Sequence, residues 1–339
     1  MSRSEFTLDL AAIRHNAERL LAALERSELW AVVKADGYGH GAVDVSRAAL
    51  DAGATALCVA TVAEGLELRR ALPDARVIVL GPTPDDERAE AREGRLEIVV
   101  AGPRVPEGVP VHLKLDTGMG RWGLSDLPIA TDRNVVGVMS HLASADCDPE
   151  FTRTQITRFR EATEPHRHLT RHLANSAGLL RFPEARFDAA RCGIALYGIS
   201  PFGDDPGNDG LRPALRWVSE LAQVKLLQPG ESTGYGRRFV ARRPTWIGIV
   251  PVGYADGFRR DLTGTTVLVG GERTHVVGTV SMDSLAVELG GERPLGEEVL
   301  LLGDGIRAED HARVADTIAY ELVSGLTTNA RRARRMVIG

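Results

Sequence analysis

Residues 29–41 read Leu-Trp-Ala-Val-Val-Lys-Ala-Asp-Gly-Tyr-Gly-His-Gly, an apolar run that ends at Lys34 and a turn with glycine at every second position from 37 to 41. A helical pattern follows over residues 43–52, and a second apolar run occupies residues 56–60. Strand–helix–strand units of this kind pair their strands in parallel through right-handed crossovers. The stretch therefore predicts the first unit of an α/β fold, with Lys34 where a strand enters its loop.

The alternation of apolar runs and helical stretches continues through the first two-thirds of the chain. Further helical patterns include residues 62–72 and 151–164. The candidate strands cover residues 31–34, 56–60, 76–80, 96–100, 111–115, 135–139, 169–173 and 186–194. Eight such units in about 200 residues suit a (β/α)8 TIM barrel. A doubly wound open sheet is the alternative, but the early strands lack the GxGxxG turn that its dinucleotide-binding form needs.

The pattern changes after residue 212, which predicts a second domain. Short β-rich runs are separated there by turns rich in glycine and proline, and a helical stretch appears only at residues 312–325. The runs cover residues 245–250, 265–269, 275–277 and 298–302. We expect a barrel domain over residues 1–212, a linker within residues 201–213, and a C-terminal, mainly antiparallel β domain over residues 213–339.

The composition indicates a globular protein and excludes several functional classes. The chain has 339 residues, 43% hydrophobic and 26% charged, with a net charge of −5. This balance excludes intrinsic disorder and gives no general reason to bind nucleic acid or an anionic membrane. Three distant cysteines, Cys58, Cys147 and Cys192, make neither a disulfide framework nor a metal motif, so we expect no metal. The sequence shows no signal peptide and no apolar run long enough to span a membrane, so we expect a cytoplasmic location.

Lys34 carries the clearest chemical signal, because lysine is unusual at the end of an apolar strand. The C-terminal ends of barrel strands are where active sites form. A lysine desolvated there has a lowered pKa and becomes a nucleophilic amine that can form a Schiff base. Gly37, Gly39 and Gly41 allow the backbone to approach a ligand closely. From these residues alone, a lysine that reaches into solvent before a flexible turn remains the alternative.

Residues 34–41 resemble the pyridoxal-phosphate attachment motif of alanine racemases, and further segments resemble that family in the same order along the chain. These segments are residues 114–123 (Lys-Leu-Asp-Thr-Gly-Met-Gly-Arg-Trp-Gly), 140–146, 172–176, 191–198, 234–236, 253–257, 281–283 and 320–322. The resemblance implies a fold type III racemase that uses pyridoxal 5'-phosphate to interconvert L- and D-alanine and supplies D-alanine for peptidoglycan. It also implies a barrel followed by a β domain.

Three other functions are weighed against this one. A broader racemase acting on serine or lysine is the enzyme alternative. A non-catalytic pyridoxal-phosphate carrier would need no second base such as Tyr235. A Schiff-base aldolase on the same barrel would lack the cofactor-binding set that includes Ser176 and Arg191.

The resemblance implies that two bases flank the cofactor. Lys34 holds it as an aldimine, and Tyr235 lies on the opposite face, so a proton leaves one face of the substrate Cα and another returns to the other face. An isolated phenol loses its proton only near pH 10, and His141 with Arg191 is implied to assist. Arg191 is also implied to face the pyridine nitrogen, where a permanent donor weakens the electron sink. From the residues alone, Arg191 paired with Asp188 is the alternative.

The resemblance further implies how the phosphate and the substrate are held. Hydroxyl or backbone N–H groups of five residues bind the phosphate: Tyr38, Ser176, Gly193, Ile194 and Tyr320. Three residues contact the substrate: Arg121, Tyr254 and Met282. Ser176 also suits a helix N-cap before residues 177–180, and Arg121 also suits a solvated loop charge.

Lys114 is implied to be modified, because in many family members the matching lysine is carbamylated and steadies the arginine that matches Arg121. An unmodified Lys114 paired with Asp116 is the alternative. The family's counterpart of Tyr235 comes from the partner subunit, so the resemblance implies a homodimer with shared active sites. The chain departs from the family at Cys192, in a short stretch between Arg121 and His141, and in an arginine-rich ending over residues 329–336, which suits a solvated tail or a partner contact.

Overall fold

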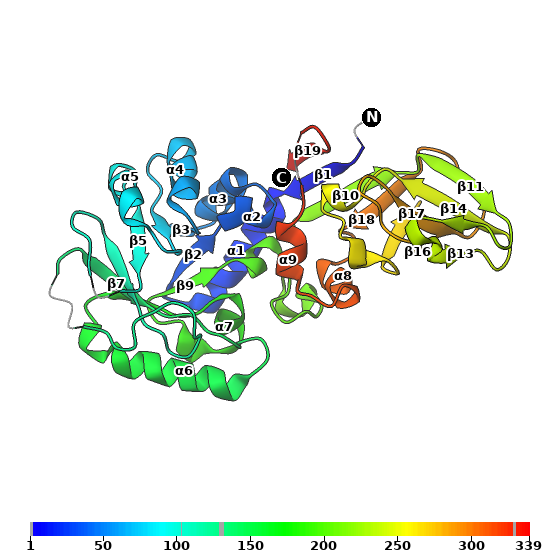
Figure 1. The fold of residues 1–339 in the computed structure, drawn as a ribbon. Helices are drawn as coiled ribbons and strands as arrows, with labels where there is room; N and C mark the ends of the chain where they lie inside the picture. Colours follow the sequence, from blue (N-terminus) through cyan, green and yellow to red (C-terminus); the bar gives the residue numbers. More distant parts are fainter. Residues whose placement is uncertain (1–2, 103, 129–131, 328–329) are drawn as a thin grey trace. The chain divides into compact units, whose positions relative to one another are not determined.

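The computed structural model describes residues 3–102, 104–128, 132–327 and 330–339 (Figure 1). The chain divides into two compact units. The first unit contains residues 12–212, and the second combines residues 3–11 with residues 213–339. Each unit is described separately below.

The first unit is a closed barrel of eight parallel strands, which confirms the predicted fold class (Figure 1). The strands are β2 (Glu28–Val32), β3 (Ala56–Val59), β4 (Val77–Val79), β5 (Glu97–Val100), β6 (Val111–Lys114), β7 (Val135–Met139), β8 (Thr170–His172) and β9 (Ala189–Cys192). Pairing of β2 with β9 closes the ring, with Glu28 opposite Ala189 and Trp30 opposite Arg191. Most strand residues are buried on both faces, as expected when helices cover a parallel barrel.

Helices follow β2, β3, β4, β7 and β8, and one further helix precedes β2 (Figure 1). They are α1 (Leu10–Leu24), α2 (Lys34–Tyr38), α3 (Ala42–Asp51), α4 (Val62–Ala71), α5 (Arg88–Glu93), α6 (Pro149–Ala162) and α7 (Ser176–Arg181). Local signals start two of them. Thr61 and Glu64 form a capping box at α4, and Asp148 caps α6, where Pro149 supplies a preset backbone angle at the first position.

The second unit is a nine-stranded, mainly antiparallel sheet in the order β11-β14-β17-β16-β15-β18-β10-β1-β19, with a separate β12–β13 pair. The strands are β1 (Glu5–Asp9), β10 (Leu215–Glu220), β11 (Gln223–Leu227), β12 (Ser232–Thr233), β13 (Phe239–Val240), β14 (Thr245–Val250), β15 (Thr266–Val269), β16 (Glu272–Val277), β17 (Leu285–Leu289), β18 (Glu298–Leu302) and β19 (Arg334–Ile338).

The expected barrel domain of residues 1–212 needs one correction, because residues 3–11, which contain strand β1, belong to the second unit. β1 pairs antiparallel with β10 and parallel with β19, so it belongs to the sheet of the second unit. Phe6 and Leu8 alternate with polar residues and are buried, and the Phe6 ring stacks on Trp217 at a centroid distance of 4.9 Å. The alternation buries one face of β1 against this sheet.

The helix expected at residues 312–325 is two short helices, α8 (Ala308–Val314) and α9 (Ala319–Ser324). Asp316 separates them in the left-handed region, with φ of 49°. A non-glycine residue in this conformation cannot continue a right-handed helix. The single expected helix is therefore wrong, and the break lets each helix set its own apolar side on the sheet.

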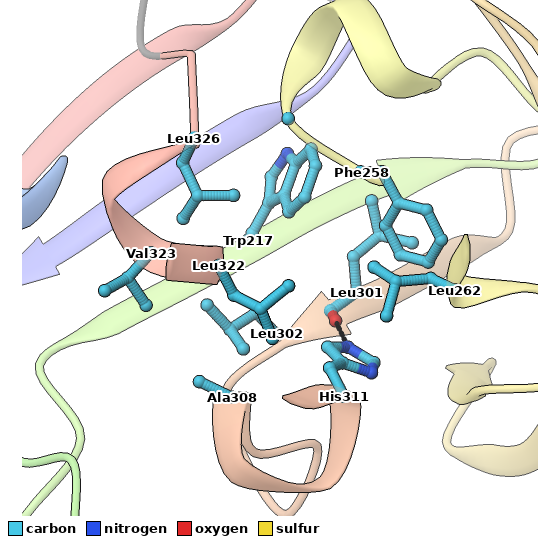
Figure 2. Close-up of a pocket in the computed structure, with 11 residues that line it drawn as sticks. Trp217, Phe258, Leu262, Leu301, Leu302, Ala308, His311, Leu322, Val323 and Leu326 are labelled. Atoms are coloured by element: carbon cyan, nitrogen blue, oxygen red, sulfur yellow. Dashed lines mark hydrogen bonds between the residues drawn. The ribbon is translucent and has the colours of Figure 1, made fainter. Parts of the chain in front are cut away.

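A small apolar pocket lies among the helices and strands of the second unit (Figure 2). His311 is the polar residue at its edge. Its Nε2–H donates to the Leu301 carbonyl at 2.7 Å, and its Nδ1 accepts from the Thr265 hydroxyl at 2.6 Å. Other lining residues include Trp217, Phe258, Leu262, Leu302, Leu322, Val323 and Leu326. The lining indicates part of the domain core and offers little polar chemistry to a ligand.

Two features are absent from the described residues. No helix in this part of the chain is long and apolar enough to cross a membrane. The same part of the chain holds no group of three or more His, Cys, Asp or Glu side chains placed to bind a metal ion.

Candidate active site

Lys34 stands at the C-terminal end of β2, the end of a barrel strand where active sites are built. Strand β2 stops at Val32, and the Val33 N–H is bonded to the Cys58 carbonyl of the neighbouring strand at 2.8 Å. The Lys34 side chain is half-buried. Burial lowers its pKa below the ordinary lysine value, and the charge of Arg121 lowers it further, while Glu64 acts in the opposite direction.

Within α2, the turn after Lys34 is left-handed and not a regular α-helix. Ala35, Asp36 and Tyr38 all have positive φ, between 48° and 53°. Non-glycine residues adopt this region at a cost of roughly 1–2 kcal/mol each, and such strain is found at functional sites held by their surroundings. Here the Asp36 carboxylate accepts the Ala42 N–H at 2.8 Å, and Glu64 accepts the Ala35 N–H at 2.8 Å. These bonds fix the backbone on which Lys34 is mounted.

Arg191, on β9, is 3% exposed and is held by four acceptors. Its Nη1 donates to His172 Nδ1 at 2.7 Å and to the His172 carbonyl at 2.8 Å. Its Nη2 donates to the carbonyls of Ser140 at 2.7 Å and Leu173 at 3.1 Å. These four bonds use all four Nη hydrogens. Among the described residues the Nε–H of Arg191 has no partner, so it remains for a ligand.

The alternative pairing of Arg191 with Asp188 is not formed. Asp188 instead accepts from the side chain and the backbone N–H of Arg171, at 3.3 and 2.8 Å. His141 Nδ1 also faces the guanidinium, 3.4 Å from Arg191 Nη2, which is a longer distance than those to the four acceptors. Burial lowers the pKa of His141 to about 3, helped by the charges of Arg191 and Lys114. His141 is therefore a neutral imidazole at physiological pH.

The predicted phosphate-binding residues of the barrel meet beyond the end of β9. Gly193 is essential to the packing, because a Cβ there would lie 2.5 Å from the Tyr38 hydroxyl. The Ser176 hydroxyl accepts the Ala195 N–H at 3.3 Å, and Ile194 begins the 3-10 turn that follows. Ser176 is not the helix N-cap, since the Asn175 side chain caps α7 by accepting the Gly178 N–H.

Lys114 ends β6 and lies near the other site residues. Burial lowers its pKa to about 8, and the charges of Arg121 and Arg191 contribute. Its ammonium lies 5.4 Å from the centre of the Trp122 ring, and Arg121 contacts the same ring at 5.1 Å. Asp116 forms no ion pair with Lys114 in the described part of the chain; its carboxylate accepts three backbone N–H groups of residues 118–120.

The second unit brings Tyr235, Tyr254 and Met282 onto neighbouring loops. The Tyr235 carbonyl accepts from the Thr279 hydroxyl at 2.8 Å. A Cβ at Gly253 would lie 2.2 Å from the Ser281 carbonyl, so only glycine lets the Tyr254 and Met282 loops touch. The three side chains are 71%, 42% and 52% exposed respectively. Such exposure of large apolar groups is typical of a surface that meets a ligand or partner.

The arginine-rich ending helps to hold these loops. Arg332 donates to both oxygens of the buried Asp256, at 2.7 and 3.1 Å, and to Asp283 at 2.7 Å. Asp256 also accepts the Gly253 N–H at 2.9 Å. Of the two interpretations of residues 329–336, a solvated tail is therefore wrong for the described residues 330–336, whereas Asn329 lies outside the described residues. Tyr320 lies on α9 of the same unit and is half-buried.

Sequence reasoning missed three features of the site. His172 holds Arg191, and Glu64 holds the turn after Lys34. The third feature is compositional: only three of the 41 lysines and arginines are lysine, namely Lys34, Lys114 and Lys225. Two of these three amines lie at the site, where a neutral amine can do chemistry that a guanidinium cannot. A count of lysines against arginines would have singled them out.

Comparison with known proteins agrees with this arrangement. Residues 8–201 match the model of the alanine racemase N-terminal domain, and residues 214–335 match that of its C-terminal domain. The chain is 42% identical to an alanine racemase of Beutenbergia cavernae, over 94% of both chains. It is 38% identical to that of Geobacillus stearothermophilus, over 93% of this chain and 89% of the relative.

Solved structures show the same relationship. The crystal structure of an alanine racemase from D-cycloserine-producing Streptomyces lavendulae superposes with a TM-score of 0.92 at 36% identity, over 100% of this chain and 98% of that one. The biosynthetic alanine racemase of Pseudomonas aeruginosa gives the same TM-score and identity, over the whole of both chains. The family models and these relatives together cover both units, and the chain therefore belongs to the alanine racemase family.

Proposed function

We propose that this enzyme interconverts L- and D-alanine with pyridoxal 5'-phosphate bound at Lys34. The observation that carries the proposal is a lysine of lowered pKa at the C-terminal end of β2, together with a buried arginine on the neighbouring strand β9 whose Nε–H, among the described residues, is its one unbonded donor. A lysine amine suits covalent attachment of a carbonyl cofactor. A fixed N–H donor suits the nitrogen of a pyridine ring.

The residues of this chain fit the cofactor. Only glycine at position 193 lets the Tyr38 hydroxyl lie against the backbone there, because a Cβ would be 2.5 Å from that oxygen. Ser176, Tyr38 and the N–H groups of Gly193 and Ile194 would hold the phosphate, with Tyr320 contributing another hydroxyl. Pyridoxal phosphate, when bound, acidifies the Cα–H bond of an attached amino acid.

Proton transfer then falls to two residues of this chain. The Lys34 amine and the Tyr235 hydroxyl would serve the two faces of the substrate Cα, each taking a proton in one direction and returning one in the other. His141 is neutral because of its low pKa, and its Nδ1 faces Arg191 Nη2, so its hydrogen lies on Nε2. This Nε2–H would donate to the Tyr235 oxygen and make that hydroxyl easier to deprotonate. Arg191 keeps the ring nitrogen unprotonated, which favours reprotonation at Cα over side reactions.

Substrate binding and assembly complete the proposal. Arg121 would bind the alanine carboxylate, a natural partner for a guanidinium, and Tyr254 and Met282 would close the substrate space. The active form is a homodimer, in which Tyr235, Tyr254 and Met282 of one subunit serve the barrel of the other. Their exposure within their own unit supports this assignment.

The test of the proposed function is a polarimetric assay of the purified, cofactor-loaded protein. L-Alanine should lose its optical rotation, and L-serine and L-lysine, run alongside, should react more slowly. Turnover of lysine at the rate of alanine would replace the proposal with a broad-specificity racemase.

Lys114 should carry a carbamate. Only a neutral amine adds CO2, forming an N–C bond and releasing a proton, and the pKa of about 8 makes the neutral form abundant at neutral to mildly basic pH. The positive charges of Arg121 and Arg191 would then favour the anionic product. In 13C-labelled bicarbonate, the NMR spectrum should show one carbamate signal that grows as the pH rises through about 8.

Two substitutions, one at Lys114 and one at Lys225, test the origin of this signal. Lys114→Gln should remove it, and Lys225→Gln, at an exposed strand position, should leave it unchanged. A signal that survives in Lys114→Gln, or none in the unmodified protein, would show that this amine is not the carbamylated one.

A further inference from the structure

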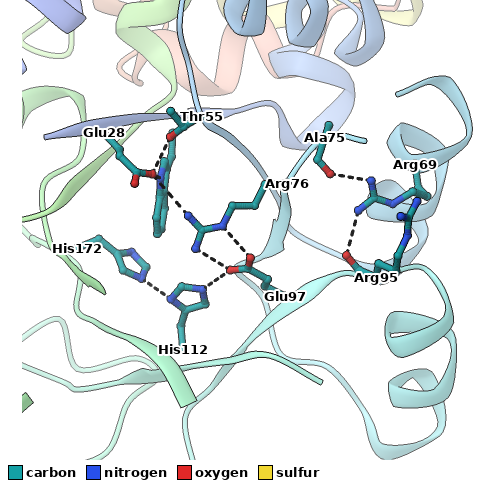
Figure 3. Close-up of polar contacts among 10 residues, drawn as sticks. Glu28, Thr55, Arg69, Ala75, Arg76, Arg95, Glu97, His112 and His172 are labelled. Atoms are coloured by element: carbon teal, nitrogen blue, oxygen red, sulfur yellow. Dashed lines mark hydrogen bonds and ion pairs between the residues drawn. The ribbon is translucent and has the colours of Figure 1, made fainter. Parts of the chain in front are cut away.

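A line of hydrogen bonds runs inside the barrel from Arg191 to Glu97, and Figure 3 shows its links between His172, His112 and Glu97. Arg191 Nη1 lies 2.7 Å from His172 Nδ1, and His172 Nε2 lies 2.9 Å from His112 Nδ1. His112 Nε2 lies 2.7 Å from Glu97 Oε2. The residues come from β9, β8, β6 and β5, so the line runs from the C-terminal ends of the strands to the first residue of β5.

The chemistry of the arginine fixes the direction of every bond. A guanidinium only donates, so His172 Nδ1 must accept. A neutral imidazole has one donor and one acceptor, so His172 carries its hydrogen on Nε2 and donates to His112 Nδ1. His112 then carries its hydrogen on Nε2 as well, and donates it to Glu97. Both histidines are neutral, because burial lowers the pKa of His112 and lowers that of His172 well below the ordinary value.

The line ends at the Glu97 carboxylate, which accepts a hydrogen bond from His112 and cannot donate one. Burial alone would raise the pKa of Glu97, but hydrogen bonds from His112 and Arg76 outweigh it and lower the pKa to about 2. Arg76 holds the carboxylate with two bonds, from Nε at 2.7 Å and Nη2 at 2.9 Å. An ionised carboxylate only accepts. A permanent donor and a permanent acceptor thus close the line at its two ends.

The surroundings keep water away from the two imidazoles of this line. Both imidazoles are fully buried, and the Trp30 ring packs against them at centroid distances of 4.5 Å from His172 and 5.7 Å from His112. Arg191 forms no ion pair with a carboxylate in the described part of the chain, so Glu97 is the anion that this line connects to it. In a low-dielectric interior, linked hydrogen bonds polarise one another.

We propose that Glu97 is a positioning residue for Arg191, acting through two histidines held in one tautomer. The proposal rests on the proposed function in one respect, that the Arg191 Nε–H faces the cofactor ring. With Glu97 ionised, each imidazole is a better acceptor toward Arg191, so the guanidinium is held by its Nη side and its Nε–H stays directed outward. No other arrangement of hydrogens satisfies all three links.

The first test needs no substitution in the measured protein. In the full-length, 15N-labelled protein, long-range 15N–1H NMR distinguishes the two neutral tautomers and the imidazolium of each histidine. His112→Gln and His172→Asn serve only to assign the signals. Both residues should be neutral with hydrogen on Nε2. An Nδ1–H tautomer or a protonated ring at either position would overturn the proposal, whether or not the protein racemises alanine.

The second test separates positioning from local structure. Glu97→Gln removes the charge and keeps the shape, and Glu28→Gln is the matched control. Glu28 lies in the same polar cluster, 3.5 Å from Arg76, but does not contact His112. In Glu97→Gln, the Nε2–H proton signals of His112 and of the more distant His172 should both move upfield, as expected for weaker hydrogen bonds, and the control should move neither.

The enzymatic readout should follow the same pattern. We expect kcat for alanine to fall on the order of tenfold in Glu97→Gln, the size of effect seen when an outer partner of a functional group is lost, with KM nearly unchanged. A chemical-shift change confined to His112, or an equal kcat in both variants, would reduce Glu97 to a local structural role. Absence of racemisation in the unmodified protein would instead reject the proposed function and leave the tautomer result standing.

Discussion

Lys34→Ala should yield a colourless enzyme with almost no activity on alanine. The substitution removes both the amine that attaches the cofactor and one of the two proton-transfer groups, and the latter loss alone costs roughly 10²–10⁴-fold. The amine is prepared for attachment, because burial lowers its pKa. The measurement is the visible absorbance of protein loaded with pyridoxal phosphate, followed by borohydride reduction and peptide mapping. In the unmodified protein, the cofactor should be recovered on the peptide that contains Lys34.

The scarcity of lysine makes this experiment decisive. Only Lys114 and Lys225 could otherwise carry a reduced cofactor on a side chain. Lys225→Ala, at an exposed position of β11, should keep full colour and activity. A coloured Lys34→Ala protein that racemises alanine at a normal rate would contradict the assignment.

Tyr235→Phe should be nearly inactive, and mixing it with Lys34→Ala should restore activity. Removal of the hydroxyl eliminates one positioned proton-transfer group, again worth roughly 10²–10⁴-fold. If Tyr235 serves the barrel of the partner subunit, a mixed dimer contains one site with both lesions and one site with neither. Activity should then return toward half of that of the unmodified dimer, measured by polarimetry on dimers purified with two different affinity tags.

The alternative geometry gives a different result. If Tyr235 folded onto its own barrel, every site in the mixed dimer would carry one lesion and activity would stay at the level of the single variants. Each variant remixed with itself controls for the exchange procedure. Inactive mixed dimers of verified composition, or a fully active monomer at high dilution, would exclude the shared site.

The barrel could be predicted because its strands are buried on both faces. Such strands are continuous apolar runs, and the run at residues 135–139 coincides with β7. The run at residues 245–250 of the second unit likewise coincides with β14. The strand at residues 334–338 had no such signal, because β19 lies at the edge of its sheet and begins with two arginines. For β1 the sequence did hold a signal, the alternation of polar and apolar residues over Glu5–Asp9, but a pattern of only five residues is weak.

Some residues of the candidate site could be predicted from the sequence, and others could not. Lys34, Arg121 and Tyr235 lie in short motifs, so a resemblance to a known family could point to them from the amino-acid sequence alone. The line from Arg191 to Glu97 has no local motif, because its residues are brought together by the closing of the barrel. His172 and His112 are 60 residues apart, and Glu97 is 15 residues before His112. Only the order of strands in space makes them neighbours.

The position of β1 in the sheet has a consequence for folding during synthesis. This strand leaves the ribosome before every strand of the barrel, yet its antiparallel neighbour β10 follows about 200 residues later and its parallel neighbour β19 later still. At 5–20 residues per second, β1 waits roughly 10–40 s for its first neighbour, while every strand of the barrel can pair in the meantime. A strand translated before the barrel is thus paired after it, and removal of β19 would leave one edge of β1 without its neighbour.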